Sequence, residues 1–511
     1  MTAARGERAG LAALLLAAVA GWALVPTYPD YDAYYDLIWG RAVMHGVAPG
    51  FQTFAAPTEH PLYIALAGLL SLAGTGADRL LVLVGMLSLA ALTAGSYVLG
   101  RELFGRLPAL LGALCVGSSF ALLLYAVRAF VDVPFLALVI WAAALEARGS
   151  PAPYAPPALP AGGEPRSERA GEPEAQRARG PGGERAGERV GRGVVPMALL
   201  AAAGLLRPEA WVLAGLYWLW CWGGRDARAR IGLAALVAVS PLVWALVDDA
   251  VTGDPLFSLH ATNKLATALG RERGIVHVPA SFVTFLADVA RPPVALAGVI
   301  GLVLAVRRFG LARMAVPIAL LAGGALTFVG TGLAGLSIIQ RYLTVPAVAL
   351  CVLAGYAVLG FTTLEPGPLR TRWRQGAIGA LVVGAAFFVL KVASFGALRG
   401  ELRFIQSSHA ELRTLLAQPR VRSGMRCGAL TFPTYRLVPD ARWLLHLDAR
   451  AVRTRAADPA PGAVAVYITG GQTIEKRFGR ADGVNRSTNE PPAGSPTLRS
   501  GPFAVYVRRG C

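Results

Sequence analysis

Long apolar stretches, repeated along most of the chain, limit its fold more than any other feature. A helix that crosses a bilayer needs about 20 predominantly apolar residues. Only 16% of the 511 residues are charged, whereas soluble domains typically carry about a quarter. The sequence therefore predicts an all-α polytopic membrane protein. Its apolar runs lie at about 11–25, 61–74, 79–99, 107–126, 133–147, 194–206, 209–222, 231–247, 281–306, 312–330, 342–361 and 376–396.

Basic residues predict the orientation of these helices, because short cytoplasmic loops carry an excess of Lys and Arg. Arg5 and Arg8 precede the first run, which lacks a small-residue cleavage site and is predicted to be an uncleaved span. The other basic loops are 101–106, 225–230, 307–313 and 370–374. All four are cytoplasmic only if the run at 61–74 lies along the outer surface. This topology gives about 11 spans, a multi-pass plasma (inner) membrane location and an extracytoplasmic C-terminus.

Composition divides the chain into four parts. An N-terminal membrane module covers 1–147 and contains a polar outer loop at 26–63. Residues 148–193 are rich in Pro, Gly, Ala, Arg and Glu, which predicts a disordered cytoplasmic linker. A second membrane module follows at 194–396, and residues 397–511 form a polar tail.

The tail has strand-like stretches at 463–469 and 503–507 and helical spacing of apolar residues at 402–416. We expect a small extracytoplasmic α/β domain that is a structural or acceptor-guiding cap, since it contains no nucleotide loop or hydrolase elbow. Cys427 and Cys511 both lie in the tail and can form a disulfide if it is outside the cytoplasm. No Cys or His spacing suggests zinc.

The net charge of +18 comes from 49 Lys and Arg against 31 Asp and Glu. In a membrane protein this excess is typical of basic cytoplasmic loops. Basic grooves with interleaved aromatic residues are absent, so the sequence does not indicate a nucleic-acid partner.

The outer loop at 26–63 contains the strongest candidates for chemistry. Asp32 and Asp36 are four residues apart, so they share a helix face, and aromatic residues surround them. A partly shielded carboxylate can take a proton from a hydroxyl group. Solvation of an outer loop is the alternative explanation, but several acidic residues among aromatics at a membrane boundary favour function. The loop's acidic residues are Asp30, Asp32, Asp36 and Glu59, and His60 follows the last of them.

Two further motifs fall where one span ends and the next begins. Arg128 and Asp132 lie at such a junction, and Asp132 is predicted on the same membrane face as Asp32. It can equally cap a helix, because Asp before Val-Pro is a good helix start. Arg207 and Glu209 flank Pro208 between two short apolar runs. They form either a structural ion pair or a site for an anionic phosphate, which suits the planar guanidinium.

Two motifs come later in the chain. Lys264 lies in the predicted outer loop 248–277 and is one of three lysines, the others being Lys391 and Lys476. Most charges of that loop are explained by solvation, and Lys264 is the exception that we retain. Arg341 and Tyr342 begin a late span, where they are either interfacial anchors or a phosphate contact.

Taken in order, these motifs resemble the GT-C glycosyltransferases, the class of protein O-mannosyltransferases and lipid A aminoarabinose transferases. The resemblance covers roughly residues 1–396. The matching segments are Asp32-Ala-Tyr-Tyr35, His60-Pro-Leu-Tyr63, Asp132-Val-Pro134, Arg207-Pro-Glu209 and Arg341-Tyr342. The loop lacks the adjacent Asp-Glu pair typical of O-mannosyltransferases, and His60 stands where a first Pro is common.

The resemblance implies a GT-C-like helical bundle and an inverting hexosyl- or pentosyltransferase. Asp32 is then the general base, with Asp36 or Asp30 as the fallback. The implied donor is a polyprenyl-phosphate sugar, whose phosphate Arg207, Lys264 and Arg341 would hold, and the acceptor is a glycan, lipid or protein. Some relatives use a divalent metal near these carboxylates, which Asp32, Asp132 and Glu59 alone do not establish.

Two other functions remain open. In a transporter or lipid flippase, charges at helix breaks would form a substrate path, although the chain lacks the matched halves common in transporters. In a non-catalytic envelope assembly protein, the outer tail would be the functional part. A nucleotide-sugar donor is disfavoured, because no soluble nucleotide-binding machinery is visible.

Overall fold

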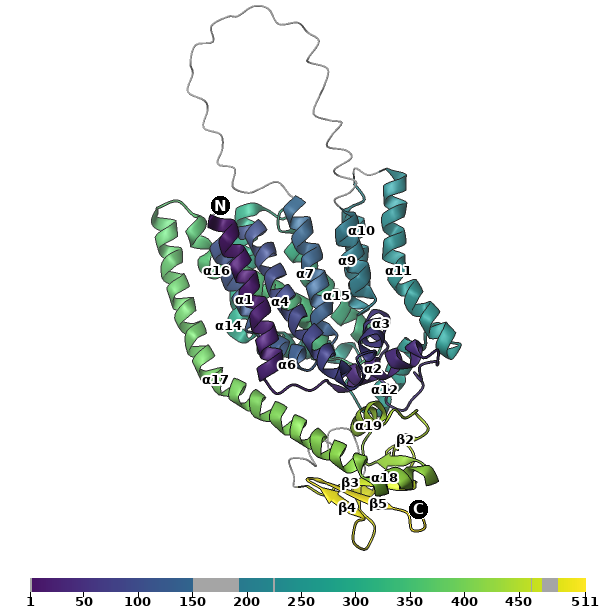
Figure 1. Cartoon of the computed structure of the whole chain (residues 1–511). Helices are drawn as coiled ribbons and strands as arrows, with labels where there is room; N and C mark the ends of the chain where they lie inside the picture. Colours follow the sequence, from purple (N-terminus) through teal and green to yellow (C-terminus); the bar gives the residue numbers. More distant parts are fainter. Residues whose placement is uncertain (1, 150–192, 224–225, 461, 471–485) are drawn as a thin grey trace, which may run out of the picture.

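The computed structural model describes residues 2–149, 193–223, 226–460, 462–470 and 486–511. A bundle of helices makes up most of the molecule, and a small domain with a sheet lies at one end of it (Figure 1). Except for 148, 149 and 193, the linker predicted at 148–193 lies outside the described residues.

The N-terminal half of the bundle contains seven described helices. They are α1 (Thr2–Leu24), α2 (Tyr31–Met44), α3 (Pro61–Ser71), α4 (Ala77–Phe104), α5 (Arg106–Gly117), α6 (Phe120–Val127) and α7 (Asp132–Gly149). The second half continues with α9 (Val194–Gly204), α10 (Glu209–Trp220), α11 (Ala227–Thr252), α12 (Phe257–Ala268), α13 (Val278–Ala290), α14 (Pro292–Phe309), α15 (Ala315–Leu333) and α16 (Thr344–Leu359).

Seven helices in the described parts are long and apolar enough to cross a membrane, which agrees with a multi-pass membrane protein. They are α1, α4, α11, α14, α15, α16 and α17 (Pro368–Ala417). Helices α5 and α6, bent by 54°, give an eighth if the pair is one span. The predicted count of about 11 is therefore not confirmed. Helices α3 and α9 are apolar but have only 11 residues each, too few to cross a bilayer alone.

Helix α16 is the centre of the bundle, with 89% of its apolar window buried. Glycines let its neighbours approach its backbone, as is common between membrane helices. A Cβ atom on Gly355 of α16 would clash with the carbonyl oxygen of Pro108 on α5. A Cβ atom on Gly301 of α14 would clash with that of Leu353. These contacts fix the position of α16, whose preceding turn carries Arg341.

Replacing Gly355 with Val is therefore expected to destabilise the bundle by about 1–3 kcal/mol, the usual cost of overpacking. Its side chain has no space unless α5 and α16 separate. The thermal midpoint of the purified protein in detergent measures the effect. Gly379→Val is the matched control, because nothing lies within 4 Å of a Cβ atom on Gly379 of α17. Equal midpoints for the two variants would contradict this packing.

Helix α17 has 50 residues and leads from the bundle into the tail domain (Figure 1). The domain's sheet has the strand order β2-β1-β3-β5-β4, in which β1 is parallel to β2 and β3 while β5 is antiparallel to β3 and β4. Leu412, Leu415 and Leu416 of α17 pack into the same core as the sheet. The strands are β1 (Leu430–Phe432), β2 (Val452–Thr454), β3 (Val464–Ile468), β4 (Leu498–Ser500) and β5 (Phe503–Val507), and the short helices are α18 (Pro419–Gly424) and α19 (Val438–Leu445). Strands β3 and β5 occupy the two predicted strand positions.

The tail domain is attached to the outer loop through α2. Arg41 of α2 donates hydrogen bonds to the carbonyl oxygens of Trp443 and Arg442, at 3.0 and 3.3 Å. Its guanidinium also lies 4.3 Å from the centre of the Trp443 ring. Because α19 carries these partners, the tail domain has a fixed orientation over the loop at 26–63.

Cys427 and Cys511 are both free thiols in the structure, and their side chains are hydrogen-bonded to each other. The disulfide therefore stays a prediction. In protein prepared without reductant, we expect both cysteines to resist alkylation until a reductant is added. Alkylation of both thiols in the unreduced protein would contradict the prediction.

Candidate functional site

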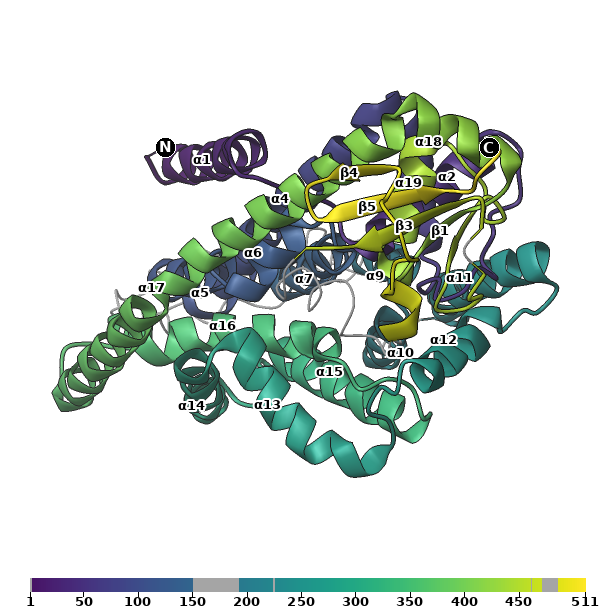
Figure 2. The same ribbon diagram turned by 90° about the horizontal axis from the view of Figure 1, so that it is seen from below.

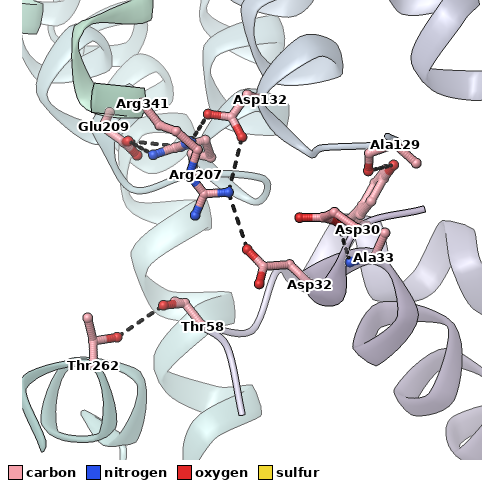
Figure 3. A network of polar contacts seen from close by, with 11 residues as sticks. Asp30, Asp32, Ala33, Thr58, Ala129, Asp132, Arg207, Glu209, Thr262 and Arg341 are labelled. Carbon is pink, nitrogen blue, oxygen red and sulfur yellow. Dashed lines mark hydrogen bonds and ion pairs between the residues drawn. The ribbon is translucent and has the colours of Figure 1, made fainter. Parts of the chain in front are cut away.

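Asp30 sets the start of α2 and thereby the position of Asp32. Its Oδ1 accepts a hydrogen bond of 2.9 Å from the backbone N–H of Ala33, which makes Asp30 the N-cap. Its own N–H donates to the carbonyl oxygen of Arg128 at 2.8 Å. Burial, together with the charge of Asp32, raises the pKa of Asp30 to about 7. Asp30 therefore has a structural role, and it directs Asp32 out of the first turn of the helix (Figure 3).

Five charged side chains form a continuous series of ion pairs (Figure 3). Arg341 Nη1 lies 3.2 Å from Asp32 Oδ2 and 3.5 Å from Asp132 Oδ2. Arg207 pairs with the other oxygen of Asp132 and with Glu209, whose Oε1 lies 2.8 Å from Arg207 Nε. The predicted motifs of the loop, of α7, of the α9–α10 break and of the start of α16 thus meet in one place. Their order is Asp32, Arg341, Asp132, Arg207 and Glu209.

The two aspartates of this series differ in accessibility. The side chain of Asp132 is 0% exposed, and both of its oxygens contact a guanidinium. The side chain of Asp32 is 23% exposed and makes one ion pair, through Oδ2. Asp32 is therefore the carboxylate with an oxygen available to a substrate, while Asp132 positions the two arginines.

Asp36 lies one helical turn after Asp32. Asp32 lines a cavity at this end of the bundle, and Asp36 does not. It is buried, and no hydrogen bond reaches its Oδ1. Burial and the charges of Asp32 and Asp30 raise the pKa of Asp36 well above its usual range. Asp30 lines the cavity too, but it is buried and caps α2, so Asp32 is the predicted base with the most accessible carboxylate.

A cavity of about 350 Å³, here called the central cavity, opens beside Asp32. Its walls combine the outer loop, the segment around Arg128, the α9–α10 break, α12 and the turn before α16. Part of its wall also comes from α17 and the tail domain, through Ile405, His409, Tyr435, Arg436 and Asp440. The tail is therefore part of the site, which the sequence did not show.

Two of these tail-side residues, His409 of α17 and Asp440 of α19, contact each other. Their side chains are buried, and the His409 ring stacks on Tyr28 of the outer loop with centroids 4.1 Å apart. A sequence signal for His409 existed. It occupies the apolar face of the predicted helix at 402–416, together with Leu402, Ile405, Leu412 and Leu416, where a titratable residue is unusual.

Glu59 and His60 lie at the end of the loop in different surroundings. His60 lines the central cavity, and burial, with the nearby Arg207 charge, lowers its pKa to about 3, so the ring is neutral. Glu59 instead contacts Ser258 of α12, whose Oγ lies 2.8 Å from Glu59 Oε2 and 2.9 Å from Asp248 Oδ1. Ser258 Oγ also accepts from Trp244 Nε1 at 2.8 Å. One hydroxyl proton makes one full hydrogen bond, so two ionised carboxylates at this hydroxyl group would leave one of them poorly compensated.

This contact predicts a pH-dependent stability. Burial raises the pKa of Glu59 from 4.5 to about 7, so ionising Glu59 costs stability as the pH rises through that interval. Glu59→Gln resembles the protonated acid. We expect it to be more stable than the wild type at pH 8, by at most about 3 kcal/mol, and equally stable near pH 4.5. Thermal unfolding at both pH values tests this, with the exposed Glu272→Gln as control. A Glu59→Gln difference independent of pH would contradict it.

Two other predicted residues have separate positions. Tyr342 lines the central cavity and lies under Arg207, whose guanidinium is 5.5 Å from its ring centre. Lys264 is exposed and lines a neighbouring cavity of about 770 Å³ between the outer loop and α12. The structure therefore does not bring Lys264 into the ion-pair series. In the described parts of the chain, no group of three His, Cys, Asp or Glu side chains could hold a metal ion.

No family model matches the chain, and no curated protein matches it. Solved structures similar to it include the Archaeoglobus fulgidus oligosaccharyltransferase in the apo form, with 12% identity and a TM-score of 0.46 over 88% of this chain and 64% of that chain. The same enzyme tethered with an acceptor peptide gives 12% identity and 0.47 over 94% and 68%. The Archaeoglobus fulgidus enzyme AglB, in complex with an inhibitory peptide and a dolichol-phosphate, gives 10% and 0.42 over 87% and 64%. This chain thus spans less than two thirds of the first structure. At these scores, neither fold nor activity is inferred from the likeness.

Proposed function

We propose that this chain is a membrane glycosyltransferase of the GT-C type. It transfers a sugar from a polyprenyl-phosphate donor to an extracytoplasmic acceptor, with inversion at the anomeric carbon. The observation that carries the proposal is the position of Asp32. Its carboxylate is partly exposed at the wall of the central cavity, and Arg341 holds it beside a buried cluster of fixed charges.

In this reaction Asp32 accepts the proton of an acceptor hydroxyl group as its oxygen attacks the anomeric carbon. The bond between that carbon and the phosphate oxygen breaks, and its electron pair leaves with the lipid phosphate. A phosphate leaving group needs no protonation, only positive charge nearby. The acceptor oxygen attacks in line with the bond that breaks, so the base and the leaving group lie on opposite faces of the sugar and the configuration is inverted.

The cavity supplies cations for the leaving group. Arg207 is buried and already pairs with Asp132 and Glu209, so it supports the cluster instead of binding phosphate. Arg341 faces the cavity and is shared between two carboxylates. Arg271 also lines the cavity and makes no ion pair with any described residue. We assign the phosphate contact to Arg341 and Arg271.

Proteoliposomes that contain the purified protein and a sugar-labelled polyprenyl-phosphate donor test this proposal against transport. The glycosyltransferase moves the label onto an acceptor and releases polyprenyl phosphate. A transporter or flippase moves the intact donor across the bilayer without breaking it. An assembly protein does neither.

A further inference from the structure

A third cavity, of about 590 Å³, lies between α17 and the bundle. None of its lining residues lines the central cavity. Its walls come from α5, α14, α16 and α17, and most are apolar, including Leu111, Ile300, Val358, Leu381 and Phe388. We call this cavity the α17 groove.

Two cations, Arg291 and Lys391, line the α17 groove. Arg291 packs over Phe120, with 5.4 Å between its guanidinium and the ring centre, and Phe120 contacts Phe395 of α17 edge to face at 5.8 Å. Lys391 lies on α17 one turn before Phe395 and also lines the groove. Neither cation makes an ion pair with a described residue. Arg291 has a φ of 67° in the turn between α13 and α14, where it caps both helices.

Both cations lie toward the end of the bundle that carries the tail domain. Helix α15 leads to Arg341 in the central cavity, so α14, which precedes it, has Arg291 at that same end. Lys391 is 23 residues from the start of α17, which is about 35 Å of helix, close to the thickness of a bilayer core. The groove is therefore apolar along the bilayer and cationic near one membrane surface.

The surroundings determine what can fill such a groove. The apolar window of α17 has a mean hydropathy of 2.2 and is 0% buried, so this helix faces lipid (Figure 1; Figure 2). Water gains few hydrogen bonds in an apolar space of this kind, whereas a hydrocarbon chain of the bilayer fills it with dispersion contacts. Two cations without a carboxylate then favour a negative headgroup.

We propose that the α17 groove binds one anionic phospholipid of the bilayer. An acyl chain lies between α17 and the α5, α14 and α16 wall, and the phosphodiester contacts Arg291 and Lys391. Bound lipid holds α17 against the bundle. Because the same helix carries Ile405 and His409 into the central cavity, the lipid also positions the tail side of that cavity.

Lipid retention by the purified full-length chain tests the headgroup contact. In neutral detergent, native mass spectrometry is expected to detect one retained phosphatidylglycerol and no retained phosphatidylcholine. Arg291→Gln with Lys391→Gln should weaken phosphatidylglycerol binding about 30-fold, given the usual contribution of a cation near an anionic surface. Arg370→Gln, at the other end of α17, is the control and should not change it. Unchanged binding in the double variant would overturn the proposal.

A second variant tests the chain-binding part without altering charge. Nothing lies within 4 Å of a Cβ atom on Gly384, which lines the groove, or on Gly379, which does not. Gly384→Leu should displace the lipid, and Gly379→Leu should not. Retention of phosphatidylglycerol by the Gly384→Leu protein would contradict the groove as its site.

Two further probes distinguish the source of the phosphate. Inorganic phosphate should neither displace the lipid nor raise the thermal midpoint, because it cannot fill the apolar part. Displacement of phosphatidylglycerol from the wild-type protein by polyprenyl phosphate would reassign the groove to the donor lipid and overturn the phospholipid proposal. These readouts do not depend on sugar transfer, so they fail or succeed independently of the proposed activity.

Discussion

Replacing Asp32 with Asn is expected to reduce sugar transfer by about 100-fold to 10,000-fold, the usual contribution of a general base. The amide is isosteric and cannot accept the acceptor's proton. The ion pair with Arg341 is lost, but Asp132 still holds that arginine, so folding should be preserved. Initial rates with a sugar-labelled polyprenyl-phosphate donor measure the effect, and the thermal midpoint checks the fold.

Two controls make this result specific. Asp249→Asn removes an exposed carboxylate at the end of α11 and should leave the rate unchanged. Asp36→Asn replaces a buried acid that does not line the central cavity, so we expect a change of no more than a few-fold. A large loss in Asp36→Asn, with full activity in Asp32→Asn, would move the base to Asp36.

Replacing Arg207 with Met is expected to have the largest effect on stability, about 3–5 kcal/mol. The substitution leaves the buried carboxylates of Asp132 and Glu209 without their main partner, and an uncompensated buried charge is far more costly than a lost ion pair. The thermal midpoint and the yield of monodisperse protein measure it. Arg372→Met, an exposed arginine near the start of α17, is the control.

A double variant separates charge from shape at this position. Adding Glu209→Gln to Arg207→Met removes one of the two orphaned charges, so part of the lost stability should return. If the double variant is less stable than the single variant by the full effect of Glu209→Gln alone, the two residues are not coupled and the ion-pair series does not stabilise the bundle.

Sequence motifs predicted the members of the site better than their roles. Asp32 and Arg341 are 309 residues apart, and only the order of short motifs suggested that they meet. The sequence left Arg207 and Glu209 open between an ion pair and a phosphate site. The structure shows the ion pair. The sequence could not decide, because the burial of this pair and the position of Asp132 depend on how α7 packs against α9. Lys264 was chosen for its rarity, which carries no information about position.

Helix lengths and the tail were harder to predict for physical reasons. Hydropathy cannot distinguish a spanning helix from two short helices, so the bend between α5 and α6 was hidden within one apolar run. The tail domain lines the cavity because α17 is one continuous helix. It runs from apolar residues that face lipid, such as Leu390, to residues buried against the tail domain and the outer loop, such as His409. Strands β3 and β5 were predictable because their β-branched and aromatic residues form short buried runs.

The most direct test of the central claim uses purified protein in nanodiscs with an acceptor-containing membrane extract and a panel of polyprenyl-phosphate sugars labelled in the sugar. We predict that the wild-type protein transfers the label from one donor to an acceptor and releases polyprenyl phosphate in equal amount. The Asp32→Asn protein should transfer no label and release no polyprenyl phosphate, while its thermal midpoint stays unchanged. Equal label transfer by the wild type and the Asp32→Asn protein would contradict the account, as would movement of the intact donor across proteoliposomes without cleavage.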